Sequence, residues 1–284
     1  MNDFCVFILS HGRAKNVITY KTLRKCGFTG EVYIVIDDED NTEKEYCEQF
    51  KEKVVQFSKL EISKKFDTMD LSEDRRTIVY ARNACFEIAK KLGYKYFLEL
   101  DDDYTSFEYR FPSEDNKKLL VKKCENLDKI FEAMIKFLKT SKAHTVAFAQ
   151  GGDFIGGIKS GTYNRKVLRK AMNTFFCNSD KPFYFIGRIN EDVNTYTLKG
   201  SQGWLGFSIT DAAIVQKQTQ KNAGGMSDVY IESGTYLKSF YSVICMPSAV
   251  KISAMGDKHL RLHHNVDWDK CVPKILNEKY KKPR

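Results

Sequence analysis

The chain of 284 residues is long enough to bury a substantial core, and its 42% hydrophobic and 29% charged residues are typical of a globular protein. It has no run of about 18 uncharged apolar residues, which excludes a membrane-spanning helix, and its eight cysteines form no CxxC pair, which argues against structural zinc. The net charge of +9 suits a polyanionic partner such as nucleic acid, although lysine-rich helix faces also serve solubility alone.

Strand and helix patterns alternate through the first half of the chain. Short apolar runs bounded by turn residues predict strands, and apolar residues at helical spacing predict helices. Strands are predicted at Phe4–Leu9, Val32–Ile36, Val54–Phe57 and Tyr96–Leu100, and helices at Asn16–Lys25, Thr42–Phe50 and Arg75–Leu92. The alternation indicates an α/β protein with a mostly parallel sheet and right-handed crossovers.

The second half has a less regular pattern. Strands are predicted at Tyr104–Phe111, Thr145–Ala149, Ala249–Ala254 and Leu260–His264, and helices at Asn126–Lys139, Val193–Leu198, Val229–Phe240 and Pro273–Tyr280. The polar segment Gln216–Ser227 has no hydrophobic period and is predicted to be a mobile loop. No repeat or long linker divides the chain, so we expect one domain over residues 1–284.

Three consecutive carboxylates, Asp101, Asp102 and Asp103, follow the predicted strand Tyr96–Leu100. Ligands of open α/β sheets collect beyond the carboxyl ends of such strands, and three adjacent like charges are costly unless a cation binds them. Asp101 and Asp103 are predicted to hold Mg²⁺ or Mn²⁺ and leave coordination positions open for diphosphate oxygens. The alternative is an ordinary acidic turn, with Asp102 as a structural turn residue.

The order of several motifs resembles the GT-A glycosyltransferases. Four motifs carry this resemblance in chain order: Ser10-His11-Gly12-Arg13, Asp37-Asp38, Ala81-Arg82-Asn83-Ala84 and Asp101–Asp103. Three later segments sharpen the match to the TET/JBP-associated glycosyltransferases: GRINEDVNTYT at Gly187–Thr197, QTQKNAGGMSDVYIESGTYLKSFYSV at Gln218–Val243, and the closing region with histidines and a tryptophan.

The resemblance implies a GT-A-like, Rossmann-related sheet flanked by helices, with an irregular α+β acceptor part at the C-terminal end. Residues 1–110 would form the nucleotide-sugar-binding half, and residues 111–284 the acceptor-binding and catalytic half. The donor would be a UDP-sugar, with glucose and arabinose both open. Phages carry members of this family, which implies that the acceptor is a hydroxymethylated pyrimidine in DNA, with 5-hydroxymethylcytosine the first candidate.

The resemblance also assigns site residues. In inverting GT-A enzymes a late acid deprotonates the acceptor hydroxyl, and Asp192 is favoured over Glu191 for this role; both could instead cap the helix that follows. One of the adjacent pair His263 and His264 could complete the metal shell, with His263 preferred, or both could face solvent. In an extended strand these two side chains are expected to point to opposite faces.

Further residues are candidates for contacts with the two substrates. Donor contacts are predicted for Ser10, Arg13, Asp37, Arg82 and Asp102. The arginines could also form structural ion pairs, and Asp37 could simply be solvated. Acceptor contacts are predicted for Gly151, Gly152, Trp204, Asn222, Gly224 and Gly225. The paired glycines permit positive φ and close approach to a ligand, and the second pair suits a lid, with a plain surface loop as its alternative. Trp204 could stack on an extruded base or belong to the core.

Three function classes therefore stay open: a DNA-modifying glycosyltransferase, the same enzyme scaffold with a carbohydrate, protein or cell-envelope acceptor, and a non-catalytic nucleic-acid-binding module. The scattered cysteines predict reduced thiols, and the first residues lack the basic region and cleavage site of a signal peptide. We therefore expect a cytoplasmic protein, in the host cytoplasm if it is encoded by a phage, with no membrane partner. The oligomeric state is left open.

Overall fold

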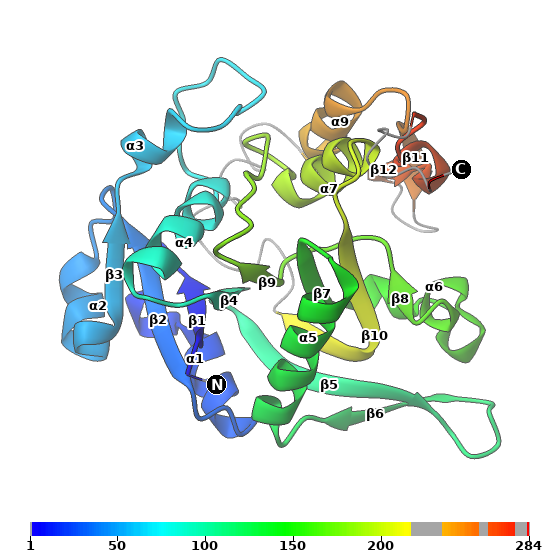
Figure 1. Cartoon of the computed structure of the whole chain (residues 1–284), viewed down its shortest axis with the longest axis horizontal. Coiled ribbons are helices and arrows are strands. Elements are labelled where there is room, and N and C mark those ends of the chain that lie inside the picture. The colour runs from blue at the N-terminus through cyan, green and yellow to red at the C-terminus, as the bar shows by residue number, and fades with distance from the viewer. Residues whose placement is uncertain (1, 217–234, 256–260, 276–282, 284) are drawn as a thin grey trace.

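The computed structural model describes residues 2–216, 235–255, 261–275 and 283. A ten-stranded sheet runs across the molecule (Figure 1). Its strands are β1 (Phe4–Leu9), β2 (Glu31–Asp37), β3 (Val54–Phe57), β4 (Tyr96–Asp101), β5 (Tyr104–Pro112), β6 (Leu119–Lys123), β7 (Thr145–Ala149), β8 (Val167–Leu168), β9 (Phe175–Asn178) and β10 (Gly206–Gln216). Their order is β3-β2-β1-β4-β9-β7-β10-β5-β6, with β8 paired to β10.

The strands of the first half are parallel, as their apolar runs predicted. β1 pairs in parallel with β2 and β4, β2 with β3, and β7 with β10. Because β9 lies antiparallel between β4 and β7, the strands β3, β2, β1, β4, β7 and β10 all run in one direction. The mostly parallel sheet is therefore confirmed, and the carboxyl ends of these strands share one edge, where α/β proteins bind ligands.

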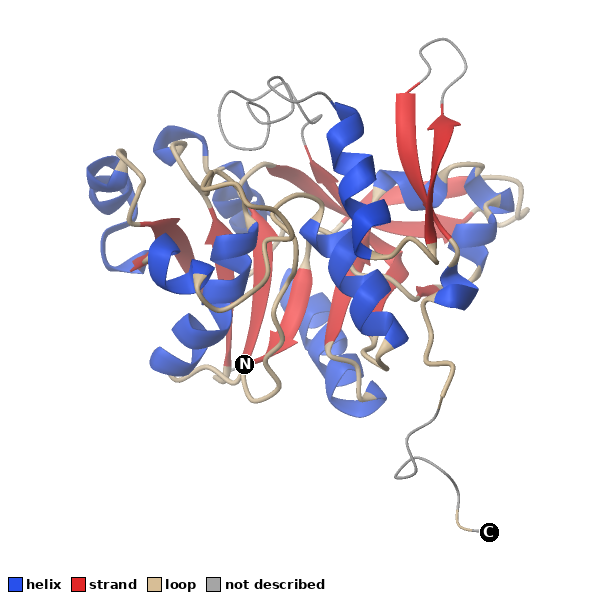
Figure 2. Ribbon diagram, turned by 90° about the horizontal axis from the view of Figure 1, so that it is seen from above, coloured by secondary structure: helices blue, strands red, loops and turns tan. Residues whose placement is uncertain are grey.

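Helices cover both faces of the sheet (Figure 2). The core on one face is built with α1 (Ile18–Lys25), α2 (Glu43–Phe50) and α5 (Leu127–Ser141), and the core on the other with α3 (Lys59–Ser63), α4 (Val79–Lys91) and α7 (Glu191–Ser201). β1 shows why both faces need cover: Phe4, Val6 and Ile8 belong to the first core, and the residues between them to the second. A strand buried on both sides appears in the sequence as a continuous apolar run.

The remaining elements lie around this frame. They are α6 (Gly161–Asn164), α9 (Thr235–Cys245), the hairpin β11 (Val250–Met255) and β12 (Arg261–Val266), and the short 3₁₀ turns η1 (Ala14–Asn16), η2 (Lys51–Lys53), η3 (Gly151–Phe154), η4 (Gly157–Lys159) and η5 (Trp268–Lys270). α9 contacts α7 and both strands of the hairpin. None of the helices in the described ranges is long and apolar enough to cross a bilayer.

Several elements were not predicted from the sequence: the strands β6, β8, β9 and β10 and the short helices α3 and α6. β6 is rich in lysine, and β10 carries Ser208, Thr210 and Asp211 inside an interrupted apolar pattern. α4 begins at Val79 rather than Arg75, and α7 begins at Glu191 rather than Val193. The predicted loop after Gln216, the start of the predicted helix Val229–Phe240 and most of the helix Pro273–Tyr280 lie outside the described residues.

Aromatic side chains packed around Phe131 of α5 should contribute strongly to the free energy of unfolding. Phe131 of α5 is fully buried, and its ring lies 5.0 Å from Phe28 and 5.4 Å from Phe176 between ring centroids. We expect Phe131→Ala to lower the free energy of unfolding by about 3–5 kcal/mol, measured by denaturant titration. The control Phe111→Ala, at a ring that is 40% exposed, should cost less than about 1 kcal/mol. Equal losses would contradict this account of the core.

Candidate active site

The acidic triplet lies at the ligand-binding edge of the sheet. Asp101 is the last residue of β4 and pairs in register with Leu9 at the end of β1. The loops that follow β1, β2 and β4 therefore begin side by side. Burial, and then the neighbouring charges of Asp103 and Asp102, raise the pKa of Asp101 to about 6, although Arg82 opposes the shift. The triplet thus carries negative charge that is only partly compensated.

Arg82 of α4 joins this triplet to the beginning of α7. Its side chain is 2% exposed; Nη2 donates to Asp101 Oδ1 at 3.0 Å, and Nε donates to Glu191 Oε1 at 2.9 Å. Nη1 donates to the carbonyl of Asn173 at 3.3 Å, and the guanidinium lies 4.7 Å from the ring centroid of Phe175. Burial would lower the pKa of Arg82, but the surrounding carboxylates raise it, so the group is a permanent cation.

Glu99 lies beneath this arginine in the middle of β4. It is fully buried, its Oε2 is 3.7 Å from Arg82 Nη1, and neither of its oxygens has a hydrogen-bond partner among the described residues. Burial raises the pKa of Glu99 well above its ordinary value, despite the opposing charge of Arg82. Burial thus disfavours the charged form of Glu99, so Arg82 interacts mainly with Asp101 and Glu191.

Asp102 turns away from Asp101 and fastens the loop after β1. It accepts hydrogen bonds from Ser10 Oγ at 2.6 Å and Arg13 Nη1 at 3.0 Å, and the Ser10 hydroxyl also lies 2.7 Å from the Tyr46 hydroxyl. Burial raises the pKa of Asp102. The structure therefore brings together Ser10, Arg13 and Asp102, which were all predicted to contact the donor. Their hydrogen bonds are to one another, and this agrees with the alternative that Asp102 is a structural turn residue.

Asp37 at the end of β2 is also engaged by the protein. His11 Nδ1 lies 2.7 Å from its Oδ2, and the buried Lys59 places Nζ 3.0 Å from its Oδ1. Burial opposes ionisation, but His11 and Lys59 together hold the pKa of Asp37 below its ordinary value. Asp37 is therefore not simply solvated, and the partly exposed His11 is the group of this cluster that faces outward.

The two candidate bases begin α7. Glu191 and Asp192 are 8% and 7% exposed and occupy its first turn, where a helix dipole stabilises negative charge. Burial and then the charge of Asp192 raise the pKa of Glu191 to about 7, against the effect of Arg82. Asp192 Oδ1 accepts the backbone N–H of Val193 at 2.7 Å. Asn190, at the N-cap position, makes no side-chain cap hydrogen bond.

The histidine pair lies behind this turn rather than on the aspartates. His264 is buried, and its Nδ1 lies 3.5 Å from the Asn190 side-chain nitrogen. Burial and nearby cationic groups lower the pKa of His264 to about 3. The rings of His263 and His264 stack at 4.4 Å, so the expectation that they point to opposite faces is wrong; two-stranded ribbons such as β11–β12 twist strongly, which lets neighbouring side chains converge.

The predicted metal set of Asp101, Asp103 and His263 is not gathered around one point. The described ranges contain no group of three or more His, Cys, Asp or Glu side chains placed to hold an ion. The β11–β12 hairpin, which carries His263, packs on α9. Asp101 and Asp103 are close enough for the charge of Asp103 to raise the pKa of Asp101, after the larger effect of burial.

Two of the residues predicted to contact the acceptor, Gly151 and Gly152, lie at the ligand-binding edge of the sheet. Gly151 and Gly152 follow β7 in η3, at the same edge as the triplet, and neither adopts the positive φ that glycine permits. A Cβ at either position would meet no atom within 4 Å, which leaves their backbone accessible to a ligand. Asn222, Gly224 and Gly225 lie outside the described residues.

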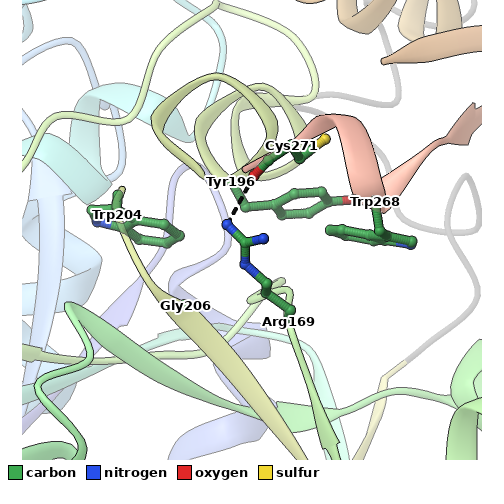
Figure 3. A pocket seen from close by; sticks show the side chains of 6 residues that line it. All are labelled: Arg169, Tyr196, Trp204, Gly206, Trp268 and Cys271. Atoms are coloured by element: carbon green, nitrogen blue, oxygen red, sulfur yellow. Dashed lines mark hydrogen bonds between the residues drawn. The ribbon is translucent and has the colours of Figure 1, made fainter. Parts of the chain in front are cut away.

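Trp204 belongs to the core. Its ring stacks on His144 at 5.8 Å and packs edge-on against Phe183 at 5.2 Å, and the residue is 7% exposed. It also borders a small hollow lined by Arg169, Tyr196, Trp204, Gly206, Trp268 and Cys271 (Figure 3). There the Arg169 guanidinium donates to the carbonyl of Cys271 at 2.8 Å. A tryptophan packed in this way offers no open face to a base.

Three residues of the site were missed in the sequence. Glu99 carried a usable signal, because a lone acid inside an apolar strand is rarely buried without a purpose. Asn173 and Lys59 carried none: each meets its partner through the fold, Asn173 by its backbone carbonyl and Lys59 across the ends of β2 and β3.

Comparison with known proteins agrees with the resemblance. The family model described as TET-Associated Glycosyltransferase matches residues 4–225. A comparison with curated proteins found no match.

Similar solved structures include three enzymes with nucleotides bound. Glucosyl-3-phosphoglycerate synthase from Mycobacterium tuberculosis, in complex with Mg²⁺ and UDP, has 7% identity and a TM-score of 0.46 over 93% of this chain and 87% of that chain. TarS 1-349 from S. aureus, with UDP-GlcNAc, has 13% identity and a TM-score of 0.47 over 87% and 67%. Mannosyltransferase PcManGT from Pyrobaculum calidifontis, with GDP-Man and Mn²⁺, has 9% identity and a TM-score of 0.46 over 87% and 74%.

The family model spans most of the chain and includes the acidic triplet, Arg82 and the first turn of α7. The protein therefore belongs to the TET-associated glycosyltransferase family and is a glycosyltransferase.

Proposed function

We propose that this glycosyltransferase transfers a sugar from a UDP-sugar to the hydroxymethyl group of a modified pyrimidine, with 5-hydroxymethylcytosine the first candidate, in DNA. The observation that carries the proposal is the convergence on Arg82 of Asp101 from the metal motif and Glu191 from the start of α7. This convergence supports a site in which the proposed metal motif and the first turn of α7 act together. The family match supports the acceptor, because the family resemblance implies hydroxymethylated pyrimidines in DNA.

The triplet suits a divalent ion. Asp101 gives one oxygen to Arg82, and its raised pKa, caused by burial and by Asp103, marks negative charge that a cation would neutralise. Asp101 and Asp103 would hold Mg²⁺ or Mn²⁺, hard ions that prefer carboxylate and diphosphate oxygens. When bound, such an ion neutralises the charge that develops on the leaving diphosphate. His263 is not placed to join them in the described geometry.

The first turn of α7 supplies the base. The hydroxymethyl oxygen attacks the anomeric carbon from the face opposite the diphosphate, the sugar–phosphate bond breaks, and UDP leaves with the bonding electrons, which inverts the anomeric centre. Asp192 accepts the proton of the attacking hydroxyl. Glu191 has one oxygen on Arg82 and acts as a positioning residue for its neighbour. Ser10, Arg13 and Asp102 shape the loop that faces the donor.

The direct test offers the protein hydroxymethylated DNA, Mn²⁺ and a panel of UDP-sugars, and weighs the released nucleosides by mass spectrometry. The expected result is a mass gain of one hexose or one pentose on the modified pyrimidine. Unmodified DNA is the matched control. A protein that hydrolyses a UDP-sugar but leaves every DNA nucleoside unchanged would indicate a carbohydrate, protein or cell-envelope acceptor instead.

The assignment of the base is tested by two isosteric substitutions. Asp192→Asn should lower the rate of transfer by about 10²–10⁴-fold and leave UDP-sugar binding unchanged, because only proton acceptance is lost. Glu191→Gln should cause a smaller loss, since it keeps a hydrogen-bond acceptor for Arg82. Transfer rates and donor binding by calorimetry are both measured. A larger loss of transfer rate in Glu191→Gln than in Asp192→Asn would make Glu191 the base and Asp192 the positioning residue.

Substitution of Arg82 separates a positioning role from contact with the donor. Arg82→Met leaves the buried Glu191 and the partly buried Asp101 without their cation, and should cost about 3–5 kcal/mol of unfolding free energy and most of kcat. Arg82→Lys keeps the charge but cannot reach both carboxylates as a planar fork does, so it should restore stability more than kcat. A change confined to the donor KM, with kcat intact, would show that Arg82 serves the diphosphate.

A further inference from the structure

The candidate active site is strongly acidic, whereas its proposed acceptor is a polyanion. Five carboxylates lie at the triplet and the first turn of α7: Asp101, Asp102, Asp103, Glu191 and Asp192. Phosphates of DNA that approach this edge are repelled unless cations nearby offset the field. Proteins obtain most of their non-specific affinity for DNA from lysine and arginine against the phosphates. A cationic surface beside the site is therefore expected.

One segment of the chain meets this expectation. Residues 154–179 contain no aspartate or glutamate and carry five cations: Lys159, Arg165, Lys166, Arg169 and Lys170. We name residues 154–173 of this segment the basic strap. It contains α6 and β8 and lies at the end of the molecule opposite β3 (Figure 1).

The basic strap begins and ends at the ligand-binding edge of the sheet. It leaves β7 through Gly151 and Gly152 at that edge. It returns at Asn173, whose carbonyl accepts hydrogen bonds from Arg82 and, at 2.9 Å, from the Tyr104 hydroxyl. Along its course Arg169 donates to the carbonyl of Gly200, in the last turn of α7, at 3.3 Å. A ligand that lies along the strap is therefore led to the edge of the sheet that carries the acidic triplet.

The five cations divide into two sets. Arg169 and Lys170 face inward: the first holds Gly200 and Cys271, and the second forms an ion pair with the buried Asp153. Lys159, Arg165 and Lys166 are exposed. Lys166 pairs with Asp211 on the surface, where both side chains are about half exposed, and such pairs are weak. Lys159 and Arg165 form no ion pair with the described residues.

We propose that the basic strap is the surface on which the phosphate backbone of the acceptor DNA lies, with Lys159 and Arg165 as its principal phosphate contacts. This inference rests on the proposed function, since it names the surface that presents DNA to Asp192. The backbone geometry supports a projecting surface: Gly156, Gly157 and Lys166 all have positive φ, which turns the chain sharply around the exposed cations.

The test compares two double variants with the same change in charge. Lys159→Gln with Arg165→Gln removes two cations from the strap. Lys90→Gln with Lys91→Gln removes two exposed cations from the end of α4, which leads to the start of β4 and so lies at the opposite edge of the sheet. Binding to a hydroxymethylated DNA duplex is measured by fluorescence anisotropy over a range of salt concentrations, and folding is checked by thermal unfolding.

The strap variant should bind DNA about tenfold or more weakly, with a salt dependence of log K reduced by about 1.8, since each lost phosphate contact removes about 0.9. Its KM for DNA should rise, while its UDP-sugar hydrolysis without an acceptor stays at the wild-type rate. The α4 variant should keep the wild-type salt slope.

A wild-type slope in the strap variant, or equal losses in both variants, would overturn the proposal. Failure of the proposed function gives a different result: wild-type DNA binding depends on the strap, but no nucleoside gains a sugar.

Discussion

The site depends on one buried guanidinium that is shared between two carboxylates. Arg82 joins Asp101 to Glu191, residues that stand 90 positions apart in the sequence and belong to different halves of the chain. Glu191 is buried and Asp101 is partly buried, and both need this cation because burial of an unpaired charge is costly. A planar fork of donors satisfies both at once, which a lysine could not do. The metal motif and the catalytic turn are thus held together by the same cation.

The carboxylates around Arg82 differ in how their charges are compensated. Burial raises the pKa of Glu99, which weakens its competition for the arginine. Asp102 and Asp37 are satisfied by cations and hydroxyls from the loops after β1 and β3, so they fix the shape of the donor side. The remaining negative charge is concentrated on Asp101, Asp103 and the start of α7. That concentration suits a divalent ion on one side and requires a basic approach surface for DNA on the other.

The sequence predicted the central strands well, because their burial is visible in neighbouring residues of the chain. β1, β2 and β4 are buried on both faces, so their apolar runs identified them, and Asp101–Asp103 followed from the strand that they end. β10 was missed because it exchanges partners along its length, from β7 to β5, which interrupts any regular alternation. Contacts between distant segments were equally hidden: no local pattern indicates that Arg82 reaches Glu191, that Lys59 reaches Asp37, or that Trp204 packs on His144.

In the proposed site, Asp101 and Asp103 hold a divalent ion against the diphosphate of the donor, in reach of the first turn of α7. The most direct test is a crystal structure of the protein with Mn²⁺ and UDP, in which anomalous scattering locates the ion. We expect one manganese peak within about 2.2 Å of carboxylate oxygens of Asp101 and Asp103, with UDP oxygens completing its shell and Asp192 facing the same space. Manganese and UDP bound away from these two aspartates would contradict this proposal.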